Sequence, residues 1–242
     1  MRYSWLDIKM LARSLFHDPL KAPAERKIQV DGIHMFIRRR TSDLFVTREV
    51  FQKHVYGKPP HGFVLDLGAN VGAFSLYAGR TATRVFAFEP DSSNFEQLAK
   101  NMALNRTLPI SIFKKAVGGK NGDAVLYQAA VNKGSSSLVH ELSTHTEMVE
   151  IMTLENALSL CGLSHVDFLK IDIEGSEYDL FETASIHTLR RISSIAMEMH
   201  RVRGKRYRDV ITKLKNAGFK VRSSYSWFWL FGMKMVYAHR DA

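Results

Sequence analysis

The stretch that most constrains the fold of this chain runs from Phe63 to Phe74 and reads F-V-L-D-L-G-A-N-V-G-A-F. An apolar strand enters a turn that contains Gly68 and Gly72, and a helical pattern follows it. The N-terminus of such a helix presents free backbone N–H groups, and glycines let a ligand approach the main chain. The spacing differs from the G-x-G-x-x-G of dinucleotide sites. The stretch therefore predicts a nucleotide-like ligand at this turn, and its spacing disfavours NAD as that ligand. The alternative is a tight turn that binds no ligand.

Strands and helices alternate after this stretch, and only the last two strands follow each other directly. Alternation is typical of a parallel sheet with helices on both faces, whereas two strands with a short connection pair antiparallel. The sequence therefore predicts an α/β fold with a doubly wound, mostly parallel sheet and a C-terminal antiparallel strand pair. The seven predicted strands of this sheet are Val64–Leu67, Arg84–Glu89, Ile110–Lys115, Val166–Ile173, Ile192–Met199, Phe219–Ser223 and Lys234–His239. A further strand, Ala124–Tyr127, is predicted to form an edge hairpin with the third.

Residues 1–57 are predicted to form a helical and hairpin extension packed on the core, and residues 58–242 to form the main domain. The apolar positions of Trp5–Phe16 predict an amphipathic helix that caps the core, lies on a membrane or dimerises. Ile28–Arg40 is predicted to be a hairpin that turns at Asp31-Gly32, and Thr47–Tyr56 a helix.

Composition narrows the class of protein. Cys161 is the only cysteine, which excludes an internal disulfide and a multi-thiolate metal site and fits a reducing compartment. The chain has neither a long apolar run nor a secretory signal, so we expect a soluble, cytoplasmic protein. The formal charge of +10 permits nucleic acid, anionic lipid or an acidic small substrate as partner and selects none of them.

Glu89 ends the second predicted strand of the sheet, about 20 residues after the glycine turn, where nucleoside-binding sheets place an acid. Its carboxylate can accept hydrogen bonds from both hydroxyls of a ribose. A cofactor with a 2′-phosphate, such as NADP, would be repelled there. The alternative is a solvated glutamate before Pro90.

The fourth and fifth strands carry charged residues on one face. By the two-residue period of a strand, Lys170, Asp172 and Glu174 share a face, as do Glu198 and His200. Unpaired buried charge is costly, so either Lys170 and Asp172 form a structural ion pair or the acids face a ligand. A histidine at a strand end can take a proton from a hydroxyl, although many such histidines are structural.

The acids and the histidine at these two strand ends could also bind a divalent ion through oxygen and nitrogen ligands. The candidate ligands are Asp172, Glu174, Glu198 and His200. The sequence contains no compact metal-ligand motif, so a metal is considered but not favoured.

Four motifs together resemble the FkbM-type family of S-adenosylmethionine-dependent methyltransferases. They are V-L-D-L-G-A-N-V-G-A-F, F-A-F-E-P, F-L-K-I-D-I-E-G-S-E and M-E-M-H, and they span Phe63 to His200. The resemblance implies a class I methyltransferase, Rossmann-like sheet with S-adenosylmethionine as cofactor. It also implies O-methylation of a hydroxyl on a sugar, a glycan- or lipid-linked acceptor or a secondary metabolite.

The resemblance also implies residue roles. The glycine turn would surround the methionine part of the cofactor, Glu89 would bind the ribose, and Ala116-Val117 would flank the adenine. The implied cofactor-binding residues are Asp66, Gly68, Ala69, Asn70, Gly72, Glu89, Pro90, Ala116, Val117 and Asp172. We expect His200 to be the catalytic base, with Glu174 or Asp172 as its competitor or as the group that orients it.

Two other functions stay open at this stage. A basic run, Arg201, Arg203, Lys205, Arg206 and Arg208, is compatible with RNA methylation, but the turn Asp172–Gly175 offers no aromatic ring to stack a flipped base. The second is a non-catalytic nucleoside-binding module whose aromatic residues dock a partner or a membrane. Those residues are Trp227, Phe228, Trp229 and Phe231, and the alternative is that they pack in the core and line the pocket.

Overall fold

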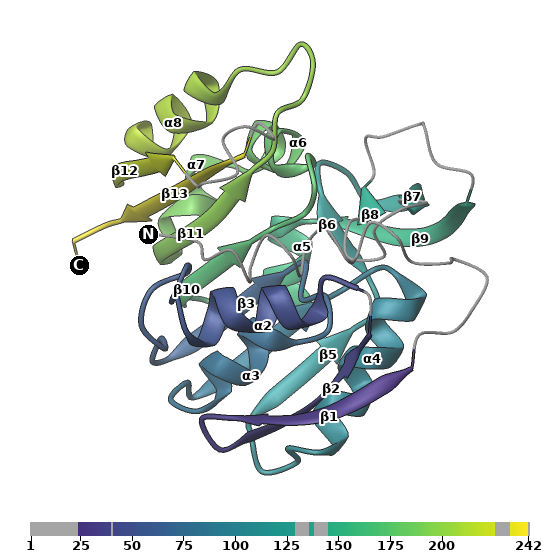
Figure 1. Cartoon of the computed structure of the whole chain (residues 1–242). Coiled ribbons are helices and arrows are strands. Elements are labelled where there is room, and N and C mark those ends of the chain that lie inside the picture. The colour runs from purple at the N-terminus through teal and green to yellow at the C-terminus, as the bar shows by residue number, and fades with distance from the viewer. Residues whose placement is uncertain (1–23, 40, 129–135, 138–144, 226–232, 242) are drawn as a thin grey trace.

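The computed structural model describes residues 24–39, 41–128, 136–137, 145–225 and 233–241. A seven-stranded sheet forms its centre, in the order β12-β13-β11-β10-β3-β4-β5 (Figure 1). Strands β11, β10, β3, β4 and β5 are parallel, and β13 is antiparallel to both β11 and β12. These strands are β3 (Phe63–Leu67), β4 (Arg84–Phe88), β5 (Ile110–Phe113), β10 (Val166–Ile171), β11 (Ile192–Met199), β12 (Lys220–Tyr225) and β13 (Lys234–His239). The predicted doubly wound sheet with a C-terminal antiparallel pair is confirmed.

Helices cover both faces of this sheet. One face packs on α2 (Asp43–Phe51) and α3 (Ala73–Gly79), with α4 (Ser92–Ala103) beside them over β4 and β5. The opposite face forms the larger apolar core with four further helices. These are α5 (Leu154–Leu160), α6 (Glu177–Thr183), α7 (Ile186–Arg190) and α8 (Tyr207–Asn216). None of the helices within the described ranges is long and apolar enough to cross a membrane.

A second, four-stranded sheet was not predicted. Its order is β6-β9-β7-β8, with β6 (Ala116–Gly118), β7 (Gly122–Gln128), β8 (Ser136–Ser137) and β9 (His145–Thr153). The prediction that Ala124–Tyr127 pairs with the third strand was wrong, because β7 pairs antiparallel with β9 along its whole length. Its alternate residues Ala124 and Leu126 pack with Ala116, Val149 and Ile151 in a small apolar cluster. The paired residues are 17 to 29 positions apart, from Gln128 with His145 to Gly122 with Ile151, which explains why local pattern alone did not reveal this sheet.

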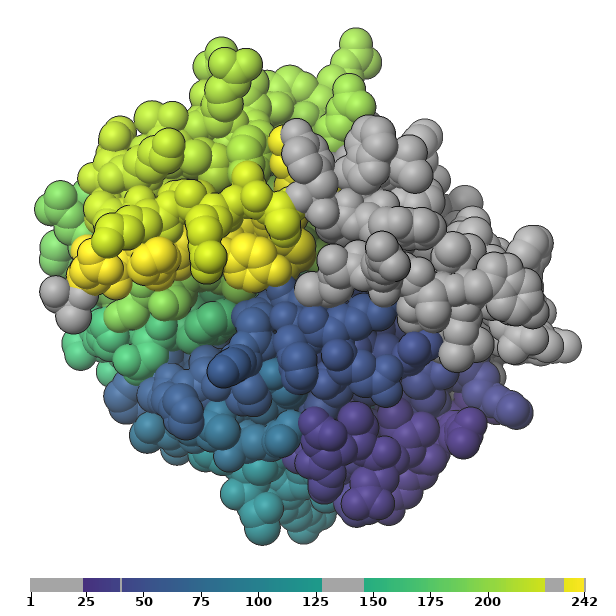
Figure 2. All heavy atoms as spheres, turned by 60° about the vertical axis from the view of Figure 1, so that its left-hand side comes forward, coloured from purple at the N-terminus to yellow at the C-terminus, as the bar shows by residue number. Residues whose placement is uncertain are grey.

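The N-terminal part contains a hairpin, β1 (Glu25–Val30) and β2 (Ile33–Arg38), followed by α2. The hairpin turns at Asp31 and Gly32, which both have positive φ, as the sequence predicted. The predicted helix lies earlier than expected, because α2 begins at Asp43 and ends at Phe51. In Figure 2 the blue segment that follows the hairpin lies between the purple hairpin and the yellow C-terminal strand. The first predicted helix and the aromatic stretch 226–232 lie outside the described residues.

A buried ion pair joins the two central strands. Lys170 on β10 lies opposite Asp66 on β3, with Nζ 3.3 Å from Oδ1, and both side chains are almost fully buried. The Lys170 ammonium also donates to the Gly68 carbonyl at 2.6 Å, while Asp172 Oδ2 lies farther away at 3.8 Å. The structural pair considered from sequence therefore exists, with Asp66 as the nearer partner.

Replacing Lys170 with methionine should strongly destabilise the fold. The change leaves the Asp66 charge buried without its cation, and breaking a buried pair in this way costs about 3–5 kcal/mol. Urea unfolding measures the loss. Lys205→Met, which removes the exposed pair with Asp179, is the control and should cost at most about 1 kcal/mol. Equal losses in the two variants would contradict this assignment.

Candidate active site

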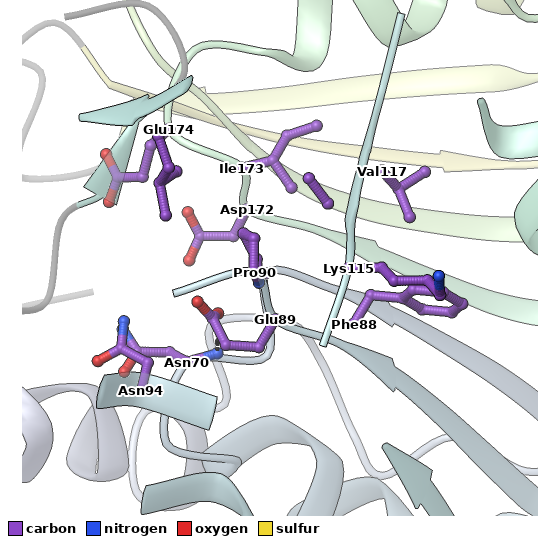
Figure 3. A pocket seen from close by; sticks show the side chains of 13 residues that line it. Asn70, Phe88, Glu89, Pro90, Asn94, Lys115, Val117, Asp172, Ile173 and Glu174 are labelled. Carbon is purple, nitrogen blue, oxygen red and sulfur yellow. Dashed lines mark hydrogen bonds between the residues drawn. The ribbon is translucent and has the colours of Figure 1, made fainter. Parts of the chain in front are cut away.

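A pocket lies at the carboxyl ends of β3, β4 and β10, between the main sheet and the second sheet (Figure 3). The empty space among these residues is about 570 Å³, which includes space open to solvent. Its lining residues are Gly68, Asn70, Phe88, Glu89, Pro90, Asn94, Lys115, Ala116, Val117, Leu126, Asp172, Ile173 and Glu174. The structure thus brings together most of the residues that the sequence selected.

The glycine turn forms the floor of this pocket. Gly68 and Ala69 donate their backbone N–H groups to the Phe88 carbonyl, which ties the turn to β4. A Cβ added to Gly68 would lie 1.8 Å from the Asp172 carbonyl oxygen, so only glycine permits this contact between the two loops. Asn70 has a φ of +52°, in the left-handed region that asparagine tolerates better than most residues. The turn is therefore built by close backbone contacts.

Glu89 is buried against this turn and uses both carboxylate oxygens. Oε2 accepts the Asn70 N–H at 2.8 Å and Oε1 accepts the Asp91 N–H at 3.0 Å. A carboxylate has about four acceptor positions, so two remain for the hydroxyls of a ribose. Burial, helped by the nearby Asp91, raises the pKa of Glu89 to about 7. This acid fits the ribose position that the sequence predicted.

The raised pKa makes cofactor affinity depend on pH. Only an ionised Glu89 could accept from both hydroxyls of a bound ribose, and this form increases as pH rises through about 7. If the neutral form binds weakly, the affinity should increase about tenfold between pH 6 and pH 8. Calorimetry with S-adenosylhomocysteine measures this change. Glu89→Gln, which cannot titrate, should remove it, and an equal pH dependence in the variant would assign the effect to another group.

Apolar side chains form the remaining wall. Phe88 stacks on Phe113 with ring centroids 4.7 Å apart, and Val117 and Leu126 come from the second sheet. A flat, partly apolar base such as adenine fits this wall. Sequence reasoning missed Phe88, Asn94, Lys115, Leu126 and Ile173. Phe88 and Ile173 directly adjoin predicted site residues, and this adjacency was an available indication.

Three predicted cofactor contacts lie near the pocket without lining it. Asp66 is fully buried, where Oδ2 accepts from Ser75 Oγ at 2.5 Å and Oδ1 faces Lys170. Gly72 caps α3 and Ala69 is buried in the turn. These residues belong to the strand and turn beside the pocket. A direct contact between them and the cofactor remains a prediction.

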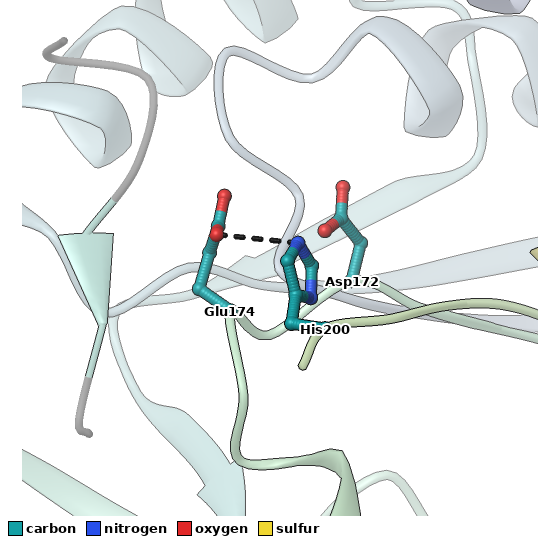
Figure 4. A group of neighbouring side chains, drawn as sticks. All are labelled: Asp172, Glu174 and His200. Atoms are coloured by element: carbon teal, nitrogen blue, oxygen red, sulfur yellow. Dashed lines mark ion pairs between the residues drawn. The ribbon is translucent and has the colours of Figure 1, made fainter. Parts of the chain in front are cut away.

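A second group of side chains borders the pocket where β10 and β11 end (Figure 4). His200 Nε2 lies 3.3 Å from Glu174 Oε2, and Nδ1 lies 3.0 Å from the fully buried Glu177 Oε1. Asp172 lies beside them and accepts from the Tyr56 hydroxyl at 3.2 Å. Glu177 and Tyr56 were not predicted as site residues. The predicted trio Asp172, Glu174 and His200 is therefore gathered in one place.

Carboxylates control the charge of His200. Burial opposes protonation, but Glu174 and Glu177 outweigh it and raise the pKa of His200 well above its ordinary value. Glu198 interacts electrostatically with His200, and burial together with Asp172 and Glu49 raises the pKa of Glu198 well above the usual range. The cluster therefore holds an imidazolium near neutral pH, and its neutral form is a strong base that becomes more abundant as pH rises.

Asp172, Glu174 and His200 are also the residues whose spacing would suit a cation. One ligand atom from each lies within 4.8 Å of the others. The ion pairs of His200 with Glu174 and Glu177 compensate part of this charge without a metal. We expect full activity after chelation with EDTA, measured as methyl transfer. A loss of activity that Mg²⁺ or Mn²⁺ restores would contradict the metal-free account.

Comparison with known proteins identifies the family. A model of the methyltransferase FkbM domain matches residues 66–221. Methyltransferase sdnD of Sordaria araneosa is 26% identical over 232 residues, which cover 80% of this chain and 88% of the relative. The 31-O-demethyl-FK506 methyltransferase FkbM of Streptomyces tacrolimicus is 25% identical over 213 residues, which cover 73% of this chain and 82% of the relative.

A solved structure supports the fold. The crystal structure of an rRNA methylase from Streptococcus thermophilus has a TM-score of 0.50 at 9% identity, covering 81% of this chain and 98% of that chain. At this identity the likeness extends to the fold alone. The family match spans more than half of the sequence, and so the chain belongs to the FkbM family of S-adenosylmethionine-dependent methyltransferases.

Proposed function

We propose that this methyltransferase transfers the methyl group to a hydroxyl oxygen of a small acceptor, a sugar or a secondary metabolite. The observation that carries this proposal is the pair formed by His200 and the buried Glu177, at the pocket edge next to Asp172. A hydroxyl must lose its proton during methylation, and this pair offers a base for it. The name of the S. tacrolimicus relative specifies methylation of an oxygen.

The residues of the pocket fit the cofactor in chemistry. Glu89 offers hydrogen-bond acceptors for ribose hydroxyls, and Phe88 and Val117 offer an apolar wall for adenine. Asp172 offers negative charge for the positively charged sulfonium of the cofactor. We assign these roles, and those of Gly68 and the rest of the glycine turn, on this basis. When bound, the cofactor supplies a methyl group that is activated on a sulfonium.

In the proposed mechanism the chain supplies alignment and proton removal. Glu177 holds the Nδ1 side of His200, which directs Nε2 toward Glu174 and Asp172. The acceptor hydroxyl would lie against Nε2 and give up its proton there as the new O–CH₃ bond forms and the S–CH₃ bond breaks. Glu174 now contacts Nε2, so the acceptor hydroxyl would replace Glu174 as the partner of Nε2. The products are a methyl ether, S-adenosylhomocysteine and a protonated His200.

The charge of the site favours a neutral acceptor. The carboxylates of Asp172, Glu174 and Glu177 act on His200, so an acidic acceptor would meet repulsion at the reacting hydroxyl. The basic run at 201–208 is partly compensated, since Lys205 pairs with Asp179. RNA is therefore the less favoured acceptor.

For the domain organisation, we propose that residues 1–57 form an extension packed on a catalytic domain at 58–242.

The test is transfer of a labelled methyl group to matched acceptors. Sugars and hydroxylated secondary metabolites should be labelled, whereas the same compounds with the reacting hydroxyl removed should not. An RNA pool and amine analogues serve as the competing acceptors. Labelling of RNA or of amines alone would contradict the proposal.

A further inference from the structure

Arg38, at the end of β2, connects the N-terminal hairpin to the cofactor pocket. Its guanidinium is buried and forms a two-pronged pair with Asp43, with Nε to Oδ2 at 3.0 Å and Nη2 to Oδ1 at 2.9 Å. The same Nη2 donates to Asn94 Oδ1 at 2.8 Å, and Nη1 donates to Ser93 Oγ at 3.1 Å. One residue of the hairpin thus contacts two residues in the first turn of α4.

The contact with Arg38 determines which way the Asn94 amide is turned. A guanidinium has only donors, so the atom that faces it must be the carbonyl oxygen Oδ1. The amide nitrogen Nδ2 must then point away from Arg38. Asn94 lines the pocket and is only 2% exposed, and Figure 3 shows it at the same end of the pocket as Glu89 and Asn70. Asn94 thus lies at the end of the pocket where Glu89 supplies acceptors, with its amide donor turned away from Arg38.

We propose that Asn94 Nδ2 donates a hydrogen bond to a ribose hydroxyl oxygen of S-adenosylmethionine, and that Arg38 is the positioning residue that fixes this donor. A hydroxyl both donates and accepts, so it can donate a hydrogen bond to the Glu89 carboxylate and accept one from Asn94 Nδ2. The inference rests on the proposed cofactor site and adds two residues to it. Arg38 lies before residues 66–221, the part that the FkbM domain model matches.

Asn94→Ala and Asn94→Asp test the donor, with the Kd of S-adenosylhomocysteine measured by calorimetry. Alanine removes one neutral hydrogen bond and should raise the Kd about 2- to 13-fold. Aspartate keeps the acceptor for Arg38 and hence the fold, but places a carboxylate beside Glu89. It should raise the Kd at least as much as alanine. Wild-type affinity in both variants would overturn the inference.

A double-mutant cycle tests the positioning role. Arg38→Met should raise the Kd in the wild-type background and have no further effect on the Kd in the Asn94→Ala background. Additive effects would overturn the role of Arg38. The control is Asn105→Ala, which removes a contact to the hairpin from the turn just after α4, Nδ2 to the His34 carbonyl at 2.7 Å, and should leave the Kd unchanged.

The Glu89→Ala variant separates this inference from the proposed cofactor site. If Glu89→Ala loses binding while the Asn94 variants do not, the inference fails and the cofactor site stands. If Glu89→Ala also binds like the wild type, the cofactor site itself is misassigned.

Discussion

Replacing His200 with alanine is expected to lower kcat by about 10²–10⁴-fold, the usual contribution of a general base. The Kd of S-adenosylhomocysteine should stay unchanged, because His200 lies outside the residues that line the cofactor pocket. Single-turnover kinetics with a hydroxyl acceptor measures the first quantity and calorimetry the second. This separation of rate from binding is the expected signature of a base that acts only on the acceptor.

The pH dependence of the same reaction gives an independent check on His200. Glu174 and Glu177, working against burial, raise its pKa well above the ordinary value, which is about 6.5. The neutral base therefore becomes abundant only at higher pH, and kcat should keep rising with pH beyond neutrality. Glu177→Gln removes one of the two carboxylates, so the rise should move to lower pH while the maximal rate falls.

His165→Ala is the matched control for His200. His165 is exposed and pairs with Asp167 at the surface, and we expect its loss to leave kcat unchanged. An unchanged kcat in His200→Ala would remove His200 from the mechanism. In that case Asp172 or Glu174 would become the candidate for proton removal.

Replacing Glu89 with alanine is the second change with a large expected effect. It removes the proposed acceptor for two ribose hydroxyls, and hydrogen bonds to a charged group contribute about 1.5–3 kcal/mol each. The Kd of S-adenosylmethionine should therefore rise about 10²–10⁴-fold. The variant also frees the Asn70 and Asp91 N–H groups that Glu89 now binds, which loosens the turn in the same direction.

Glu96→Ala provides the control for Glu89, because it removes an exposed glutamate of the adjacent helix α4. Its Kd should match that of the wild type. Thermal unfolding of both variants without ligand shows whether the fold persists. A Glu89→Ala protein that is folded and binds with wild-type affinity would contradict the ribose assignment.

The main sheet was predictable because its information is local. Each core strand is a short apolar run bounded by turn residues, and right-handed crossovers leave few arrangements for such strands. The carboxyl ends of parallel strands meet at one edge, so Glu89 and Asp172 could be assigned to one pocket. Only the strand bounds differed, since β10 ends at Ile171, directly before Asp172.

The parts that sequence did not reveal depend on contacts between distant segments. Leu126 reaches the pocket only because β7 pairs with β9, and Asn94 is oriented by Arg38 from a hairpin 56 residues earlier. Asp66, for which the family resemblance implies a cofactor contact, has Ser75 and Lys170 as its partners inside the sheet, and Lys170 comes from a strand about 100 residues later. Periodicity identifies a buried face and does not identify which charged groups meet there.

Every proposed residue role depends on the binding of S-adenosylmethionine in the pocket at Glu89. Calorimetric titration of the wild type and Glu89→Ala with S-adenosylhomocysteine, and with NADP for comparison, tests it most directly. We expect saturable binding of S-adenosylhomocysteine to the wild type, a large loss of that binding in Glu89→Ala, and no binding of NADP. Binding of NADP, or binding of S-adenosylhomocysteine that Glu89→Ala leaves intact, would contradict it.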